Sequence, residues 1–185
     1  MFLNSSDPSS TLTTLPLYLE ATHHMLSLIL QIPPVDPSTS LRTSLLLRLT
    51  GEVLQSIPGY TPSTDVLTLL LAWLRDLDHG WLVVLRQEAW DADTSSAVPA
   101  RLPQGARAAP ASQTDRTRLR SVLLAGADAI EEWLERLDAH GEGFELVLER
   151  VGLEQEFNDL FAGTLAEMGS LGGTMSDPAG MQGTC

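Results

Sequence analysis

The sequence predicts an all-α protein, a bundle of five to six helices that includes two αα-hairpins. Leucine, a good helix former, occurs 34 times among the 185 residues, whereas isoleucine, which favours strands, occurs four times. Apolar residues recur every three to four positions over long segments, and no run alternates with the period of two expected of a half-buried strand. Hydrophobic residues make up 43% of the chain, which is enough for one compact core.

Prolines and glycines divide the first half of the chain into predicted helices. We expect a first helix over 16–32, because Pro16 suits a first helical turn and Pro33-Pro34 ends the segment. A second helix is expected over about 41–57, where the apolar residues are four positions apart. A third begins at Thr61-Pro62 and is expected to stop at His79-Gly80, with a shorter helix or continuation over 81–90.

The second half contains two more predicted helices. One runs over about 115–139, and the last runs over 144–168 with a kink near Gly152. Residues 91–113 are rich in alanine, proline and serine, and we expect them to form a flexible linker within the domain.

The expected single domain covers residues 14–168. The serine- and threonine-rich residues 1–13 and the glycine-rich residues 169–185 are expected to be disordered, because neither contains enough large apolar side chains to pack.

Two segments share a pattern. Residues 72–86 and 132–149 both contain Trp-Leu-x-x-Leu-Asp followed by a glycine and a second apolar stretch. Each is predicted to be an αα-hairpin. A true duplication and two unrelated hairpins with the same need for leucine and glycine both remain open.

The charge is strongly acidic. There are 24 acidic and 11 basic residues, a net charge of −13, and every basic residue is arginine. This sign of charge disfavours binding to nucleic acid and to anionic membranes. Residues 114–168 carry 13 acidic and five basic residues, so they form an acidic half, either a solvated face or a surface for a basic partner. The absence of lysine fits a GC-rich genome or avoidance of lysine modification.

No pattern indicates catalysis. The chain has no Gly-x-Ser-x-Gly, P-loop or dinucleotide motif, and its one cysteine, Cys185, is the last residue. His79 and His140 are expected at helix C-termini, where a cation is favoured, rather than in a metal site. We therefore expect no enzyme activity, cofactor or metal. With no signal peptide or membrane span predicted, an intracellular location, cytoplasmic or nuclear, is expected.

Two apolar features indicate a protein interface. The leucine triplets 45–47 and 69–71 spread over about 200° of their helices, so we expect Leu47 or Leu71 to be exposed. A second stripe, flanked by acidic residues, is typical of a helix that docks in a partner's groove or of the core face of a bundle helix. Its members are Phe157, Leu160, Phe161 and Leu165.

These features together predict a non-catalytic interaction protein, an adaptor or a subunit of a larger complex. Its partner is expected to be a protein with a basic surface, and a hetero-oligomer is favoured over a homodimer because like acidic copies repel. The alternative is a carrier of a lipid or another small molecule in a leucine-lined cavity.

Overall fold

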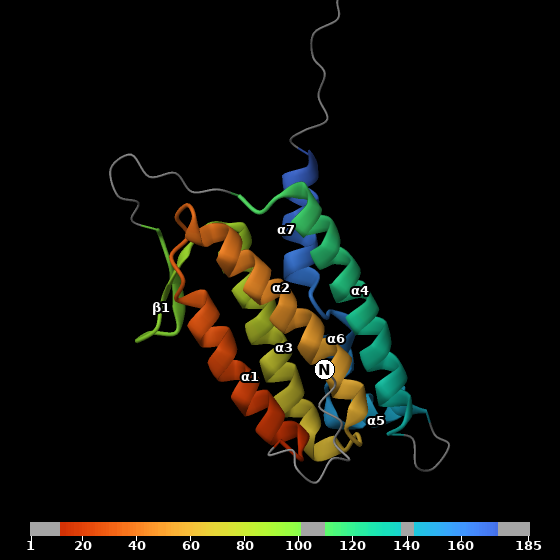
Figure 1. Ribbon diagram of the computed structural model, residues 1–185. Coiled ribbons are helices and arrows are strands. Elements are labelled where there is room, and N and C mark those ends of the chain that lie inside the picture. The colour runs from red at the N-terminus through yellow and green to blue at the C-terminus, as the bar shows by residue number, and fades with distance from the viewer. Residues whose placement is uncertain (1–11, 101–109, 138–142, 174–185) are drawn as a thin grey trace, which may run out of the picture.

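The computed structural model describes residues 12–100, 110–137 and 143–173, and it confirms an all-α bundle with one small addition, a two-stranded hairpin (Figure 1). The helical elements are α1 (Leu15–Leu30), α2 (Ser38–Ser56), the 3-10 turn η1 (Ile57–Gly59), α3 (Thr64–Leu85), α4 (Gln113–Glu135), α5 (Phe144–Val151), α6 (Glu154–Asn158) and α7 (Ala162–Gly173).

Helix α3 occupies the centre of the bundle. It packs against α1, α2 and α7, while α2 packs against both α1 and α4. Figure 1 shows α1, α2 and α4 side by side across one face, with α3 behind α1 and α2. Helix α3 is buried along most of its length because leucine, valine and tryptophan occupy more than one of its sides.

The third helix is longer than the sequence predicted. It continues through His79-Gly80 to Leu85, so the expected stop at Gly80, the αα-hairpin over 72–86 and the position of His79 at a helix C-terminus are all wrong. Gly80 is buried, and a Cβ placed on it would lie 3.3 Å from Leu26 Cδ1 of α1. The absence of a side chain at Gly80 therefore lets α1 and α3 pack closely, and Gly80 does not form a turn.

The predicted linker begins with a β-hairpin. Strand β1 (Ala89–Asp91) pairs antiparallel with β2 (Ser96–Val98), and Trp90 lies opposite Ala97. The all-α prediction included no sheet, so this hairpin departs from it, and Asp91 and Ser96–Val98 of the predicted flexible linker lie in paired strands. Residues 101–109 of the predicted linker lie outside the described residues.

The last predicted helix is divided into α5, α6 and α7. The chain breaks at Gly152, whose φ of 72° is left-handed, and again at Phe161, whose φ is 60°. Glycine adopts the left-handed region readily, so Gly152 is a natural end for α5. Helix α7 extends to Gly173, so the expectation that disorder begins at residue 169 is wrong, while residues 174–185 lie outside the described residues.

The N-terminal boundary differs slightly as well. Leu12, within the predicted disordered segment 1–13, packs against the core, and its carbonyl oxygen accepts a hydrogen bond of 3.3 Å from the Tyr60 hydroxyl. Residues 1–11 lie outside the described part of the chain. The ordered chain therefore begins before α1.

Two tryptophans fix the packing of the bundle through their indole N–H groups. Trp81 of α3 donates to Thr50 Oγ1 of α2 over 2.9 Å, and Trp133 of α4 donates to the Tyr60 carbonyl oxygen over 2.7 Å. Both rings are 1% exposed. Buried hydrogen bonds of this kind favour the observed arrangement of the helices, because a packing that breaks one leaves a buried N–H group without a partner.

Candidate functional site

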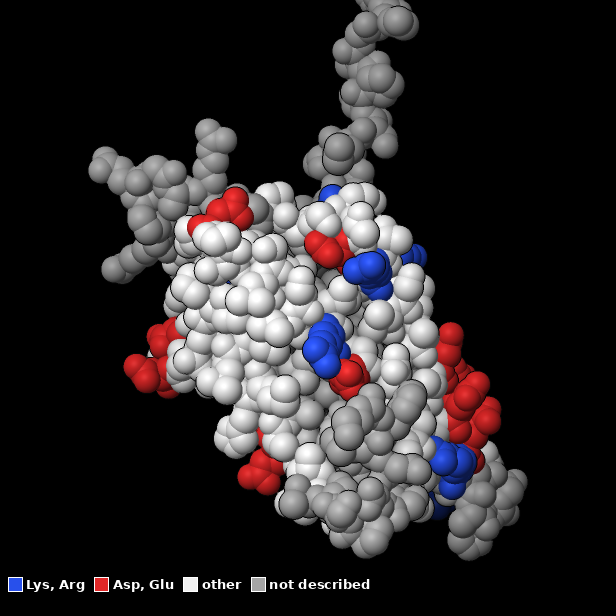
Figure 2. Space-filling view, viewed as in Figure 1, with Lys and Arg blue, Asp and Glu red and all other residues white. Residues whose placement is uncertain are grey.

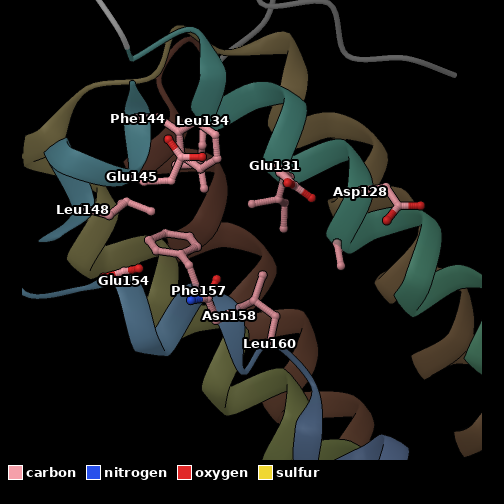
Figure 3. Close-up of a pocket in the computed structure, with 12 residues that line it drawn as sticks. Asp128, Glu131, Leu134, Phe144, Glu145, Leu148, Glu154, Phe157, Asn158 and Leu160 are labelled. Atoms are coloured by element: carbon pink, nitrogen blue, oxygen red, sulfur yellow. The ribbon is translucent and has the colours of Figure 1, made fainter. Parts of the chain in front are cut away.

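The hollow between α4, α5 and α6 combines an apolar floor with an acidic rim (Figure 3). Its volume is about 280 Å³. Below we call it the acidic pocket. Its floor contains Ile130, Leu134, Phe144, Leu148, Phe157 and Leu160, and its rim contains Asp128, Glu131, Glu145 and Glu154.

Helical spacing explains how these side chains meet. Ile130 and Leu134 of α4 are one turn apart, and Phe144 and Leu148 of α5 are spaced in the same way, so each pair forms a stripe on one face. The left-handed Gly152 lets the chain change direction after α5, and α6 then packs against α5. Figure 3 shows the labelled carboxylates spread around the apolar side chains, from α4 on one side to α5 and α6 on the other.

The surroundings of the pocket are strongly negative. Over the described residues of 127–160 there are nine acidic side chains and two arginines. Arg75 pairs with Glu156 and Arg86 with Glu167, and neither of these two carboxylates lines the acidic pocket. Figure 2 shows acidic side chains gathered along the α4 edge of the molecule. A cation near this rim gains attraction that falls with added salt.

The acidic pocket contains two of the residues that the sequence placed at an interface. Phe157 forms part of the floor but is 8% exposed, and Leu160 is half-buried beside it. Phe161 is 3% exposed and Leu165 is half-buried, and both pack with the core. The stripe is therefore mainly the core face of α6 and α7, and only its Phe157–Leu160 edge opens onto a hollow.

The expected exposure of Leu47 or Leu71 is wrong. Leu71 is 2% exposed, and Leu47 is half-buried against the core. The exposed member of each triplet is the first leucine: Leu45 is 37% exposed and Leu69 is 45% exposed. Helix α3 contacts neighbours on more sides than the sequence analysis assumed, so Leu71 is covered.

A second hollow lies between α1 and α2, and the sequence analysis missed it. It measures about 500 Å³ and is mainly apolar, with Arg48 and Glu52 on its α2 side. Tyr18 is in its lining, and burial raises the pKa of that phenol above its ordinary value. Its remaining lining residues are Leu12, Ala21, Thr22, Met25, Ile29, Leu45 and Leu49. The signal in the sequence was a second apolar stripe of α1, whose residues Ala21 and Met25, one turn apart, both line this hollow.

Histidines from two helices line a third, smaller hollow of about 200 Å³ beside the hairpin. His23 Nε2 of α1 lies 3.0 Å from Asp76 Oδ2 of α3. The His79 ring packs edge-on against Trp90, with ring centroids 5.8 Å apart. His140 lies outside the described residues. Tertiary packing thus brings together His23 and His79, which are far apart in the sequence.

Comparison of this chain with models of protein families, with curated proteins and with solved structures gave no match. Within the described ranges, no three His, Cys, Asp or Glu side chains are grouped so that they could hold a metal ion. None of the helices described here is both long enough and apolar enough to cross a membrane.

Proposed function

We propose that the protein is a non-catalytic interaction protein, an adaptor or subunit of a complex, which binds a basic amphipathic segment of a partner protein in the acidic pocket. The observation that carries this proposal is the combination of an apolar floor with four rim carboxylates. An amphipathic segment presents apolar side chains beside arginine or lysine, so it complements both parts of the pocket.

The size of the pocket limits what enters it. A volume of about 280 Å³ accommodates one or two apolar side chains but not a whole helix, so the partner backbone would lie across the rim. In that position, arginine and lysine side chains of the partner reach the carboxylates of Asp128 and Glu131 on one side. Glu145 and Glu154 are on the other side. Apolar anchors then supply affinity, and the charges supply orientation and speed of association.

The test uses a synthetic helical peptide with a leucine stripe and an arginine face, labelled with fluorescein, and measures its affinity by fluorescence anisotropy. We compare the wild type with the triple variant Glu131→Gln, Glu145→Gln and Glu154→Gln. Each exposed charge pair is worth about 0.2–1 kcal/mol, so losing three should weaken binding about tenfold. Binding to the wild type should also weaken as sodium chloride is added.

The matched control removes the same number of charges away from the pocket, through Glu20→Gln, Glu52→Gln and Asp93→Asn. These three side chains belong to α1, α2 and the hairpin turn, and none of them lines the acidic pocket. The control should bind the peptide with an affinity within about twofold of wild type. If both triple variants weaken binding equally, the peptide responds only to net charge and the acidic pocket is not its site.

The second candidate is the carrier of a lipid or another small molecule. The groove between α1 and α2, about 500 Å³ and mainly apolar, is the observation that favours it. Native mass spectrometry of the purified protein tests it directly. A copurified acyl chain, lost on substitution of Leu45 or Met25 by glutamate, would support the carrier, whereas an unliganded mass would favour the interaction protein.

A further inference from the structure

The helices α1 and α2 present an apolar face to solvent. Five large apolar side chains are exposed on it, and two of them, Met25 and Leu45, line the 500 Å³ groove between the two helices. Below we call it the α1–α2 face. Its residues and exposed fractions are Leu17 (45%), Met25 (52%), Leu28 (66%), Leu41 (53%) and Leu45 (37%).

Helical geometry makes this set continuous. On α1, Leu17, Ala21, Met25 and Leu28 follow each other at spacings of four, four and three residues, so they form one stripe. On α2, Leu41 and Leu45 are one turn apart. The opposite stripes of both helices are buried in the bundle. Each helix is therefore apolar on two sides, and one of those sides has no covering element among the described residues.

The charge of this face differs from that of the rest of the chain. Residues 15–56 contain three acidic and two basic side chains, although the whole chain has a net charge of −13. Arg48 and Glu52, whose Nε and Oε1 atoms are 3.9 Å apart, form an i, i+4 pair beside the groove. Figure 2 shows a broad uncharged area over α1 and α2, and α4 with its acidic side chains lies on the other side of α2 from α1 (Figure 1).

We propose that the occupant of the α1–α2 face is a second copy of this chain, so that two copies form a dimer through a four-helix arrangement of two α1–α2 pairs. Electrostatics favours a like partner here. The charged side chains that line the groove of this face are one arginine, Arg48, and one glutamate, Glu52, so a basic partner finds no excess of carboxylates there, while two copies that meet through it bring together surfaces of balanced charge.

The dimensions of the face also suit a dimer. Helices of 16 and 19 residues are about 24 and 28 Å long, and two such helices packed about 10 Å apart present a face about 20 Å wide. A face of that outline has a projected area of about 500 Å², and its protruding side chains add to the accessible surface, so burying it on each copy comes near the lower end of specific interfaces, about 600 Å² per partner. In a two-fold arrangement each contact occurs twice, so each exposed leucine of the face contributes to the interface from both copies.

Sedimentation velocity of the full chain, at protein concentrations from about 1 to 200 µM, tests this proposal. The expected species has twice the 20.0 kDa mass of one chain. The variants Leu28→Glu and Leu41→Glu place a carboxylate at the two most exposed leucines of the face and should weaken the dimer at least about tenfold. Leu124→Glu and Leu146→Glu, at leucines of α4 and α5 that are 44% and 50% exposed, serve as matched controls and should leave the dimer intact.

Urea unfolding of each variant separates loss of dimerisation from loss of folding. Leu28 and Leu41 are exposed, so a single chain of each variant should retain its helical circular dichroism. Salt gives a second readout: the dimer should be unchanged or strengthened by sodium chloride, whereas peptide binding in the acidic pocket weakens, so the two proposals fail independently. A wild type that is monomeric at every concentration would overturn the dimer. A copurified lipid that fills the groove of a monomer would overturn it too, as would control variants that weaken association as much as the face variants do.

Discussion

The guanidinium of Arg42 donates a hydrogen bond from Nη2 to the carbonyl oxygen of Leu30 over 2.9 Å. Leu30 is the last residue of α1, where backbone carbonyls lack partners within the helix and the helix dipole favours a cation. Nη1 of the same side chain donates to the Glu88 carbonyl oxygen over 2.8 Å, just before β1. One side chain of α2 therefore joins the end of α1 to the start of the hairpin. Arg42 is 1% exposed, and burial lowers its pKa to about 10, which leaves it protonated at neutral pH.

Replacing Arg42 with methionine should destabilise the protein by about 2 kcal/mol. The substitution removes the donor of the buried Leu30 carbonyl oxygen and of the part-buried Glu88 carbonyl oxygen, and this loss outweighs the gain from no longer burying a charge. Urea unfolding followed by circular dichroism measures the change. Arg118→Met, at an exposed arginine of α4, is the control and should change the stability by less than about 0.5 kcal/mol. Equal stability of the two variants would show that the Arg42 hydrogen bonds contribute nothing.

Two glycines in neighbouring helices should respond in opposite ways to alanine. A Cβ on Gly126 of α4 would lie 3.0 Å from Leu54 Cβ of α2, whereas a Cβ on Gly51 of α2 has nothing within 4 Å. Gly51→Ala should stabilise the protein by about 0.5–1 kcal/mol through helix propensity. Gly126→Ala gains the same propensity but forces α2 and α4 apart, for a net loss of about 1–2 kcal/mol. Thermal unfolding of both variants compares them, and a gain for Gly126→Ala would mean that the helices are not in close contact there.

Asp78 of α3 holds the start of α7. Its Oδ1 atom accepts a hydrogen bond of 2.9 Å from the Thr164 backbone N–H, which is in the first turn of α7 and has no partner within that helix. Asp78→Ala should cost about 1–2 kcal/mol and speed amide exchange in α7 more than in α1. Hydrogen exchange with mass spectrometry measures both helices. Asp76→Ala, at an exposed carboxylate of α3 two residues away, should leave exchange in α7 unchanged.

The two tyrosines of the chain should titrate above the ordinary phenol pKa. Burial raises the pKa of Tyr18 and of Tyr60, whose ring centroids are 5.7 Å apart. Absorbance of tyrosinate at alkaline pH should therefore rise later in native protein than in urea. The unfolded chain loses these protons first, so the stabilisation is complete below about pH 10 and falls as the pH rises through the folded values. Identical titration curves in buffer and urea would contradict the burial of both phenols.

The sequence predicted the helices well where local interactions decide them. The spacing of leucines placed α1, α2 and α4 within a few residues of their observed bounds, because an apolar stripe, a capping residue and a proline all act within one or two turns. Part of the acidic pocket could also be predicted from the sequence. The excess of acidic residues over 114–168 supplies its rim, and Phe157 and Leu160, which the sequence placed at an interface, lie in its floor.

Where a sequence pattern fits two structural roles, only the tertiary structure decided between them. His79-Gly80 is typical of a helix stop, but Leu26 and Leu30, some 50 residues earlier, pack over that glycine and make it a helix crossing. Each leucine triplet shows that its helix has more apolar positions than one neighbouring helix can cover. Which of these leucines is buried depends on the neighbours of the helix: Leu71 of α3 is covered, whereas Leu45 of α2 is exposed. The acidic pocket likewise exists only because Gly152 turns α6 back onto α5 and the core holds both against α4. The spacing of apolar residues along a helix is a local property, so it can be recognised in the sequence. Burial depends on contacts with residues far away in the chain, and the sequence pattern alone does not predict which of these residues come together.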